Sequence, residues 1–309
     1  MLSVVLLVIG FMLLVWGADK FVAGAASAAR RMGVSELLVG LTIVSFGTSA
    51  PELAVSVTAA LKGANEIAVG NVLGSNLFNL LVVAGLSAVL CPLTLDRALL
   101  RRDWPLSFGA AVMLGAMLFV GGGLSRVDGF ILLACFAAVM VSQIRPALHT
   151  RAVRTEGDDD SAMPVWLTLV NIVLGIGCIV LGGQLSVNGA TGIARMFGLS
   201  ETLIGLTIVA VGTSLPELVT SLVAARKGEN DIAMGNVIGS NLFNILLILG
   251  VSAAITPIPV QPTAPVDCLI LIAASAICYL PARKGVLGRA PGALMALGYA
   301  AYMVYLIGR

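Results

Sequence analysis

Long apolar runs alternate with short polar stretches along the whole chain of 309 residues. A run of about 20 apolar residues is long enough to cross the hydrocarbon core of a bilayer as a helix. Dividing the chain where charges or turn residues cluster predicts about ten such spans. They cover residues 3–29, 36–60, 67–91, 104–123, 127–145, 164–194, 201–225, 232–256, 264–281 and 287–307. The pattern therefore predicts an all-α polytopic membrane protein.

The composition agrees with a membrane environment. Charged residues make up 11% of the chain and apolar residues 59%, whereas a soluble domain has about 25% charged residues. The net charge of +2 is spread over short loops, so we expect no nucleic acid partner. The five cysteines show no metal-ligand spacing, and we expect no resident cofactor. The expected partners are ions and the lipid bilayer, and the oligomeric state stays open.

The two halves of the chain repeat each other. Residues 35–85 match residues 200–250 without a gap at an offset of 165, and about two-thirds of these positions are identical. Two motifs carry the match, because GTSxPE and GNVxGSNLFN each occur twice in register. Self-similarity at a fixed offset predicts an internal structural repeat.

One long polar loop, residues 146–163, separates residues 1–145 from residues 164–309. Each half holds five predicted spans, an odd number, so the second half would insert in the opposite orientation to the first. The odd-numbered loops carry thirteen Lys and Arg residues, and the other side of the membrane receives four. The positive-inside rule then places the odd loops in the cytoplasm and both termini outside it. We expect two inverted five-helix repeats in the cytoplasmic (inner) membrane, joined by a charged cytoplasmic linker.

A proline lies inside the second span and inside the seventh. Pro51 and Pro216 each remove a backbone donor and clash with the preceding turn, which breaks the helix and frees carbonyl groups. Such a break is tolerated in a membrane only where it is buried in protein or lines a cavity. Glu52 and Glu217 follow the two prolines, and a carboxylate in the middle of a span is costly enough to indicate a function. The sequence thus predicts two discontinuous core helices that meet at a functional site.

The side chains around the two breaks offer only oxygen ligands. Helical spacing places Thr48, Ser49 and Glu52 on one face, and Ser75 with Asn79 on a face of the next span. The second half repeats this set with Thr213, Ser214, Glu217, Ser240 and Asn244. Carboxylates, carbonyls and amides without histidine or thiol favour calcium or an alkali ion over zinc or copper.

Other conspicuous residues also fit structural interpretations. The amides of Asn76 and Asn241 fit a hydrogen bond between helices as well as a place in the ion site. Asp19 and Lys20 are adjacent near the end of the first span, and they fit a local pair or a lysine that reaches the membrane interface. Glu36 follows a serine and is typical of a carboxylate at a helix start.

With these residues and the two paired motifs, the chain resembles the calcium/cation antiporter superfamily, and within it the prokaryotic sodium/calcium exchangers. The resemblance implies ion binding between the second, third, seventh and eighth spans. Glu52 and Glu217 would bridge calcium, together with the carbonyl groups of Thr48 and Thr213. Four serines and two carbonyl groups would form sodium sites around a centre lined by two asparagines: Ser49, Ser75, Ser214, Ser240, the carbonyls of Ser45 and Ala210, and Asn79 and Asn244.

One position departs from the pattern of this superfamily. Several relatives carry an aspartate where this chain has Asn244, and an acid there is linked to potassium use. Here Asn79 and Asn244 are both asparagine, which argues against potassium co-transport. We therefore expect a secondary active antiporter, not an enzyme, that exchanges calcium for sodium. The resemblance implies alternating access, with the first and sixth spans moving past the core.

Three other functions fit parts of the pattern. A calcium/proton exchanger of the same superfamily could use the same two glutamates. An intramembrane enzyme would need a nucleophile–base pair or a metal-binding histidine, and the predicted site contains neither. A channel is disfavoured by an inverted repeat with a discontinuous helix in each half. The sequence leaves the choice between sodium and protons, and the stoichiometry, open.

Overall fold

The computed structural model describes residues 2–61, 66–151, 163–198, 210–259, 261 and 263–308. Within these residues, eight helices are long and apolar enough to cross a membrane, and one bent pair of helices would add a ninth. The chain is a helical multi-pass membrane protein, as its apolar runs predict. The span predicted at 201–225 lies partly outside the described residues.

The described residues of the first half contain three π-helical segments, η1 to η3, each continuous with an α-helix. Its helices are α1 (Leu2–Met32), α2 (Glu36–Val39), η1 (Gly40–Val44), α3 (Ser45–Thr48), α4 (Ala50–Leu61), α5 (Glu66–Phe78), η2 (Asn79–Val83), α6 (Ala84–Leu90), η3 (Leu99–Asp103), α7 (Trp104–Gly121) and α8 (Arg126–Arg151). The fourth span begins at Leu99 and not at residue 104, because η3 extends α7 by one π-helical turn.

The second half has a similar order of helices. They are α9 (Val165–Met196), α11 (Ala210–Thr213), α12 (Leu215–Arg226), α13 (Asn230–Leu242), η6 (Phe243–Ile248), α14 (Leu249–Ile255), α15 (Ala264–Ala282) and α16 (Arg289–Ile307). In the part of the chain that the structure describes, four two-residue strands, which the sequence did not predict, lie between helices: β1 (Leu93–Thr94), β2 (Gly123–Leu124), β3 (Ile258–Pro259) and β4 (Val286–Leu287).

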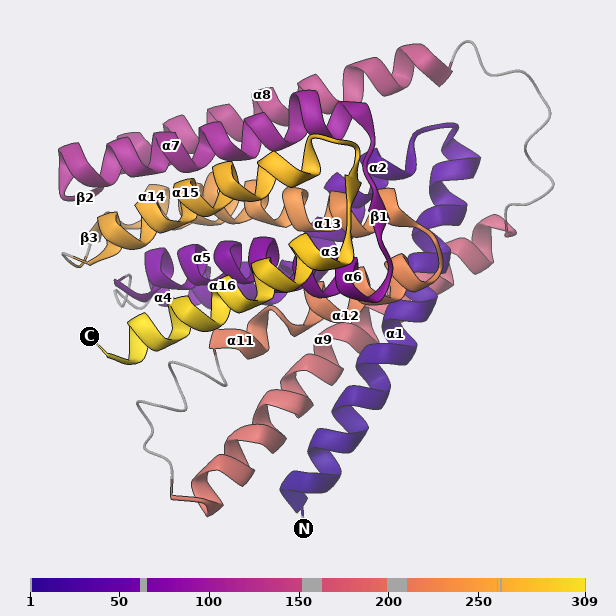
Figure 1. Cartoon of the computed structure of the whole chain (residues 1–309), viewed down its shortest axis with the longest axis horizontal. Helices are drawn as coiled ribbons and strands as arrows, with labels where there is room; N and C mark the ends of the chain where they lie inside the picture. The colour runs from indigo at the N-terminus through magenta and orange to yellow at the C-terminus, as the bar shows by residue number, and fades with distance from the viewer. Residues whose placement is uncertain are drawn as a thin grey trace.

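The strands and loops gather at two ends of the molecule. At one end β1 pairs with β4, and Leu95 N donates to the carbonyl of Gly285 at 2.9 Å. The other odd-numbered loops join this end through contacts of Asn230 with Thr94, Arg30 with Glu229, and Arg31 with the carbonyl of Met163. In Figure 1, β1 and the last turns of α1 and α8 lie on the right.

The opposite end holds the even-numbered loops of the described residues. There β2 pairs with β3, on the left of Figure 1. Thr256 donates from its hydroxyl to the carbonyl of Ala60 at 3.2 Å, and Arg126 donates to the carbonyl of Ile255 at 3.4 Å. Each two-stranded sheet therefore joins the first half of the chain to the second.

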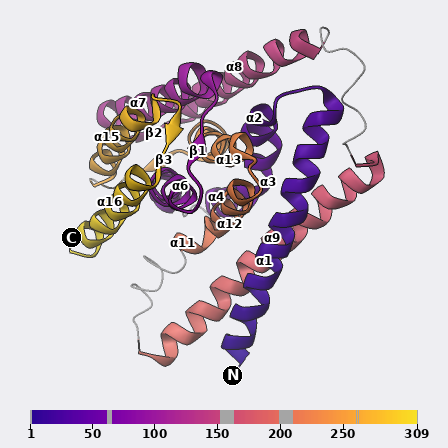
Figure 2. The same ribbon diagram turned by 45° about the vertical axis from the view of Figure 1, so that its right-hand side comes forward.

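Helices α1 and α9 lie side by side along one flank of the bundle, as Figures 1 and 2 show. Gly10 of α1 lies against Gly182 of α9, and Gly24 lies against Ile172, so the two helices run antiparallel. Glycines recur every seventh residue on both contact faces: Gly10, Gly17 and Gly24 on α1, and Gly175, Gly182 and Gly189 on α9. Small residues at this spacing let the two backbones approach closely inside a membrane.

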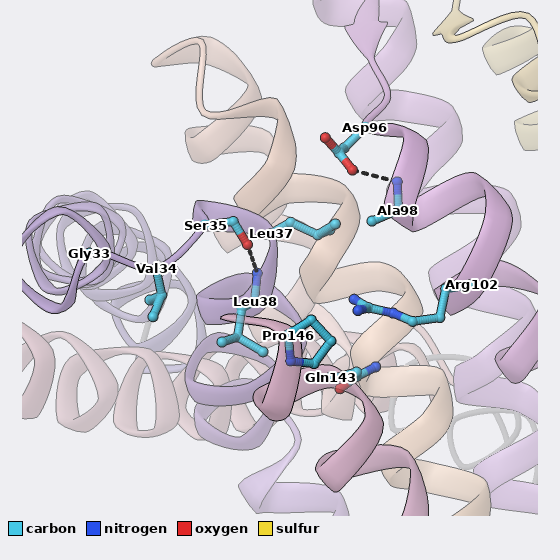
Figure 3. Close-up of a pocket in the computed structure, with 10 residues that line it drawn as sticks. All are labelled: Gly33, Val34, Ser35, Leu37, Leu38, Asp96, Ala98, Arg102, Gln143 and Pro146. Atoms are coloured by element: carbon cyan, nitrogen blue, oxygen red, sulfur yellow. Dashed lines mark hydrogen bonds between the residues drawn. The ribbon is translucent and has the colours of Figure 1, made fainter. Parts of the chain in front are cut away.

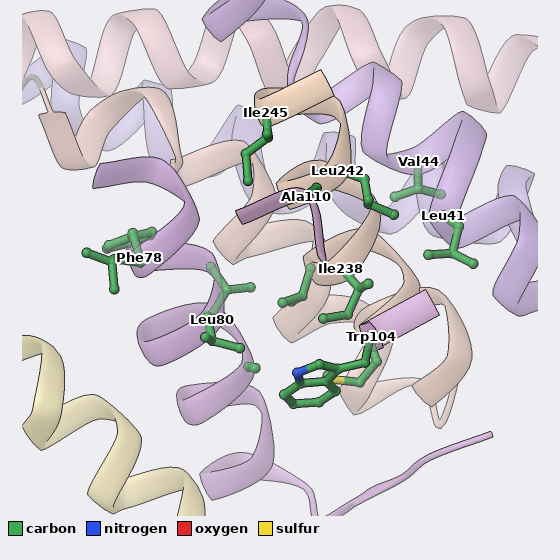
Figure 4. Close-up of a cluster of buried hydrophobic side chains, with 14 of the residues drawn as sticks. Leu41, Val44, Phe78, Leu80, Trp104, Ala110, Ile238, Leu242 and Ile245 are labelled. Atoms are coloured by element: carbon green, nitrogen blue, oxygen red, sulfur yellow. The ribbon is translucent and has the colours of Figure 1, made fainter. Parts of the chain in front are cut away.

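The centre of the bundle is formed by two spans. In the most apolar stretches of Ala68–Leu90 and Asn230–Ile255, 78% of the residues are buried, against 39% or less in the other six unbroken spans. Their side chains, including Leu80 and Ile238, are buried together with residues of neighbouring helices such as Trp104 of α7 (Figure 4). These two spans carry the GNVxGSNLFN motifs, so the repeated motifs lie in the core.

Both predicted helix breaks are present. Ser49 ends α3 with φ −85° and ψ 5°, and α4 begins one residue later at a bend of 50°. Ser214 has φ −93° and ψ 6° just before α12. Pro51 and Pro216 therefore lie in the first turn of a new helix, where a missing N–H is tolerated. The break falls just before each proline.

Candidate ion-binding site

The two glutamates that follow the helix breaks lie in one buried cluster. Glu52 and Glu217 are each 1% exposed. Ser49 donates from Oγ to Oε1 of Glu217 at 2.9 Å, and Ser214 donates from Oγ to Oε1 of Glu52 at 3.4 Å. Each break thus contacts the glutamate of the other half. These crossed hydrogen bonds bring the two carboxylates close enough to interact electrostatically.

Neither carboxylate has a cationic partner among the described residues. The salt bridges found there involve other acids, and Oε2 of both Glu52 and Glu217 lacks a hydrogen-bond donor. A buried carboxylate is ordinarily paired with a cation or bound to a metal, because an isolated buried charge is costly. The cluster is therefore suited to a small cation that supplies the missing positive charge.

Neutral hydroxyl groups surround the two carboxylates. The hydroxyls of Ser75 and Ser214 are 3.1 Å apart. Thr213 lies beside the carboxylate of Glu52, and Ser240 lies beside that of Glu217. Among the described residues, no group of three or more His, Cys, Asp and Glu side chains could hold a metal ion. A cation here would be bound by two carboxylates and neutral oxygens, a ligand set that suits calcium or sodium.

Asn236 of α13 contacts residues beside both helix breaks, and the sequence did not predict it as part of the site. Its Oδ1 accepts hydrogen bonds from Thr48 at 3.0 Å and from Ser240 at 3.4 Å. Its Nδ2 donates to Ser221 Oγ at 3.0 Å and to the carbonyl of Glu217 at 3.3 Å. The repetition of the Gly-Asn pair at the start of the second motif was the signal that could have identified it.

Asn76 and Asn241 form the predicted hydrogen bond between helices. Each side chain donates from Nδ2 to the carbonyl of the other residue, at 3.2 Å and 3.3 Å. Asn244 adds a bond from its Nδ2 to Asn76 Oδ1 at 2.9 Å. By contrast, both polar atoms of Asn79 lack a partner among the described residues. Asn79 thus presents a free amide to the buried centre of the fold.

π-helical segments position three of these residues. Asn79 begins η2 and Asn244 lies in η6. Ser45 follows η1, and its hydroxyl donates to the carbonyl of Gly40 at 2.7 Å and approaches that of Gly235 at 3.3 Å. A π-helical turn inserts an extra residue into the helix, and such turns are frequent at functional sites. Residue spacing does not reveal these turns, because the α-helical period assumes the same number of residues in every turn.

The carbonyl groups of Ser45 and Ala210 were predicted to bind sodium. The carbonyl of Ser45 accepts hydrogen bonds from Ser49 N at 2.9 Å and from the Thr48 hydroxyl at 3.3 Å. Ala210 is the first residue of α11. Sodium binding by these two carbonyls, and calcium binding by the carbonyls of Thr48 and Thr213, stay predictions.

Of the two interpretations of Asp19 and Lys20, the local pair is wrong, and the lysine that reaches the membrane interface stays a prediction. Asp19 Oδ1 lies 2.7 Å from the amino group of Lys227, which also donates to the Asp19 carbonyl at 2.8 Å. Lys20 lies instead over the ring of Trp16, 5.8 Å from its centroid. The tertiary fold brings a distant cation to Asp19, so α1 is tied to the end of α12.

A separate pocket of about 410 Å³ lies at the end of the molecule that holds the odd-numbered loops (Figure 3). At its rim Ser35 accepts a hydrogen bond from Leu38 N at 3.2 Å, and Asp96 accepts one from Ala98 N at 2.5 Å. The first bond is an N-cap and confirms the predicted helix start at Glu36. None of the residues that line this pocket belongs to the Glu52–Glu217 cluster.

The family follows from comparison with known proteins. The model of the sodium/calcium exchanger protein family matches residues 2–145 and 167–308. The chain belongs to this family. It is a membrane antiporter of the calcium/cation type, and its relatives are transporters and not enzymes.

Relatives of this exchanger match it over nearly its whole length. It is 38% identical to the putative antiporter CaxA of Alkalimonas amylolytica over 99% of both chains. It is 32% identical to the sodium/calcium exchanger MaX1 of Methanosarcina acetivorans over 97% of both. A solved structure of the sodium-calcium exchanger NCX_Mj, soaked with Na⁺ and Ca²⁺, superposes with a TM-score of 0.86 at 31% identity over 98% of each chain.

Proposed function

We propose that this exchanger moves calcium against sodium across the cytoplasmic membrane, and that both ions bind at the Glu52–Glu217 cluster. The crossed contacts of Ser49 with Glu217 and of Ser214 with Glu52 are the observation that carries the proposal. They assemble two buried carboxylates at two interrupted helices, and no cationic side chain of the described residues pairs with either. Calcium prefers carboxylate and neutral oxygen ligands, and one calcium ion would balance the two negative charges.

In this proposal each oxygen has a role. Glu52 and Glu217 bridge calcium, and the carbonyls of Thr48 and Thr213 complete its ligands. Sodium binds beside them to four hydroxyls, two carbonyls and the central amides: Ser49, Ser75, Ser214, Ser240, the carbonyls of Ser45 and Ala210, and Asn79 and Asn244. The unpartnered oxygens of the two glutamates and of both asparagines support this assignment, because a buried oxygen without a donor is costly unless an ion binds it.

Sodium is favoured over protons as the driving ion by the neutral part of the cluster. Two protons would need only the two carboxylates. The free amide of Asn79 and the paired hydroxyls of Ser75 and Ser214 add neutral oxygens of the kind that sodium binds. The relatives that are named sodium/calcium exchangers support the same choice. A calcium/proton exchanger is the alternative, since it could work with the glutamates alone.

For the fold we propose ten spans in two inverted five-helix repeats, residues 1–145 and 164–309, joined by a linker at 146–163. The gathering of odd-numbered and even-numbered loops at opposite ends supports it. The odd-loop end carries most of the Lys and Arg residues and would face the cytoplasm, with both termini outside. Alternating access would involve movement of α1 and α9. These two helices pack through a glycine seam, formed by Gly10, Gly17 and Gly24 of α1 and by Gly175, Gly182 and Gly189 of α9.

Calcium flux into proteoliposomes tests the function directly. Purified protein is reconstituted, and uptake is driven separately by an outward sodium gradient and by an outward proton gradient of equal size. We expect calcium uptake with the sodium gradient and little with the proton gradient. Uptake that follows only the proton gradient would replace the sodium assignment by the alternative, and no calcium movement under either gradient would overturn the proposal.

A further inference from the structure

A second charged pocket lies where β1 and β4 meet the ends of α7 and α15. Its volume is about 460 Å³. All of its charged lining residues are cationic: Arg97, Arg101, Arg283 and Lys284. The four side chains belong to exposed residues, and the salt bridges of the described residues do not include them. The pocket therefore concentrates positive charge from both halves of the chain.

The pocket lies at the membrane interface of the proposed fold. The span Leu99–Gly121 begins and the span Ala264–Ala282 ends beside it. Leu95 and Gly285 also line it, and Leu95 N donates a hydrogen bond to the carbonyl of Gly285 at 2.9 Å. Four like charges held together at the end of two spans repel one another unless an anion lies between them.

An apolar groove shares Tyr279 with this basic pocket and lies further along α7 and α15. The groove has a volume of about 260 Å³ between α7 and α15. It is lined by Trp104, Pro105, Phe108, Ser275, Ala276 and Tyr279. Tyr279 lines both cavities, and its hydroxyl donates to the carbonyl of Leu100 at 3.3 Å. Trp104 donates from Nε1 to Ser275 Oγ at 3.3 Å, which leaves the wall of the groove largely apolar.

We propose that the two adjoining cavities bind one anionic phospholipid. Its phosphate lies among the four cations, and one acyl chain follows the groove past Tyr279 toward Trp104. A basic pocket at the end of membrane helices attracts acidic headgroups, and a free phosphate would not need the groove. Because the pocket joins the β1 loop to the β4 loop, the bound lipid links the two halves. This proposal does not depend on which ion drives transport.

Native mass spectrometry of the delipidated full-length protein in detergent tests the site. The protein is titrated with phosphatidylglycerol and, in parallel, with phosphatidylcholine of the same acyl chains. Each cation contributes about 1 kcal/mol to binding of an acidic lipid, or about fivefold in affinity. We therefore expect Arg101→Gln/Arg283→Gln to bind phosphatidylglycerol about 25-fold more weakly, with phosphatidylcholine binding unchanged. Arg289 is an exposed arginine at the start of α16 that does not line the pocket, so Arg289→Gln is the matched control and should bind like the wild type.

Two further measurements distinguish binding of a lipid from binding of a free anion such as phosphate. Ala276→Trp fills the groove without changing the charges, and we expect it to weaken phosphatidylglycerol binding. Inorganic phosphate should compete poorly for the wild-type site. Equal binding of both lipids, unchanged binding in the double variant, or efficient competition by phosphate with no effect of Ala276→Trp would overturn the proposal. If the double variant fails to fold, Arg97→Gln/Lys284→Gln removes two other charges of the same pocket and decides the question.

Discussion

Ser49 donates a hydrogen bond of 2.9 Å to Glu217, which lies 168 residues further along the chain. The corresponding residues in the other direction, Ser214 and Glu52, are 162 residues apart and make the same contact at 3.4 Å. Each half of the chain thus supplies a carboxylate to the helix break of the other half. The cluster of two carboxylates exists only when both halves are packed together, and the predictions below depend on that geometry.

Removing either central carboxylate should stop calcium transport. In Glu52→Gln and in Glu217→Gln, the remaining charge of −1 is too small to replace the water around a divalent ion. We expect calcium affinity to fall by more than about tenfold, or about 1.4 kcal/mol, while the protein stays folded in the membrane. Radiolabelled calcium uptake and equilibrium binding measure this. Asp96→Asn, an exposed carboxylate in a loop, is the control; uptake near the wild-type rate in either glutamine variant would contradict the assignment.

Asn236 should matter for stability as well as for ion binding. Asn236→Ala removes the acceptor of Thr48 and the donor to the Glu217 carbonyl, all in a fully buried environment. Leaving such groups unpaired costs about 1–3 kcal/mol. Thermal unfolding in detergent, with and without calcium, measures the loss. Asn71→Ala changes the equivalent residue of the first half, which is only half-buried and whose Nδ2 lacks a partner among the described residues. We expect a smaller loss there, and equal losses would count against the role of Asn236.

Adding a methyl group to a glycine in the seam between α1 and α9 should destabilise the protein. A Cβ on Gly175 would lie 2.7 Å from the Cβ of Phe21, so Gly175→Ala should destabilise the protein by about 1–3 kcal/mol. Gly177, two residues away on the same helix, has no described atom within 4 Å of an added Cβ. Gly177→Ala should leave stability unchanged or raise it by about 0.5–1 kcal/mol, because alanine favours a helix. The melting temperature should therefore fall in Gly175→Ala and should not fall in Gly177→Ala, and an equal fall in both variants would contradict this prediction.

Labelling from outside the cell tests the proposed orientation. In a cysteine-free background, Arg126→Cys lies at the end with the even-numbered loops, and Arg283→Cys lies at the end with the odd-numbered loops. An impermeant maleimide added to intact cells should label the first and not the second. The reverse pattern would place the odd loops outside and contradict the positive-inside argument.

The charge of the cluster predicts a response to voltage. With Asn79 and Asn244 neutral, Glu52 and Glu217 give −2, which one calcium ion or two protons would neutralise. Exchange of about three sodium ions for one calcium would instead move one net charge, worth about 2.3 kcal/mol per 100 mV. We expect calcium transport in proteoliposomes to respond to a potassium–valinomycin potential while needing no potassium as substrate. Asn244→Asp should change cation selectivity, with Asn244→Gln as the neutral control. Transport that ignores voltage and follows pH would favour proton coupling.

The sequence alone determined the membrane fold class and the two glutamates. Apolar runs of the right length identify spans without tertiary information, because a helix in lipid must satisfy its own backbone groups. Pro51 and Pro216 locate the helix breaks for a similarly local reason, since proline lacks an amide hydrogen. The duplicated motifs then identify Glu52 and Glu217 as equivalent residues in the two halves.

Only the tertiary structure decided which residues of the two halves touch. The crossed pairs of Ser49 with Glu217 and of Asp19 with Lys227 join segments far apart in the chain, and hydrophobic periodicity does not encode the partner of a polar side chain. The π-helical turn before Ser45 rotates everything after it by an extra residue, a shift that α-helical spacing misses. The role of Asn236 depends on both effects, because it accepts a hydrogen bond from Thr48, a residue that the fold brings to it from the other half.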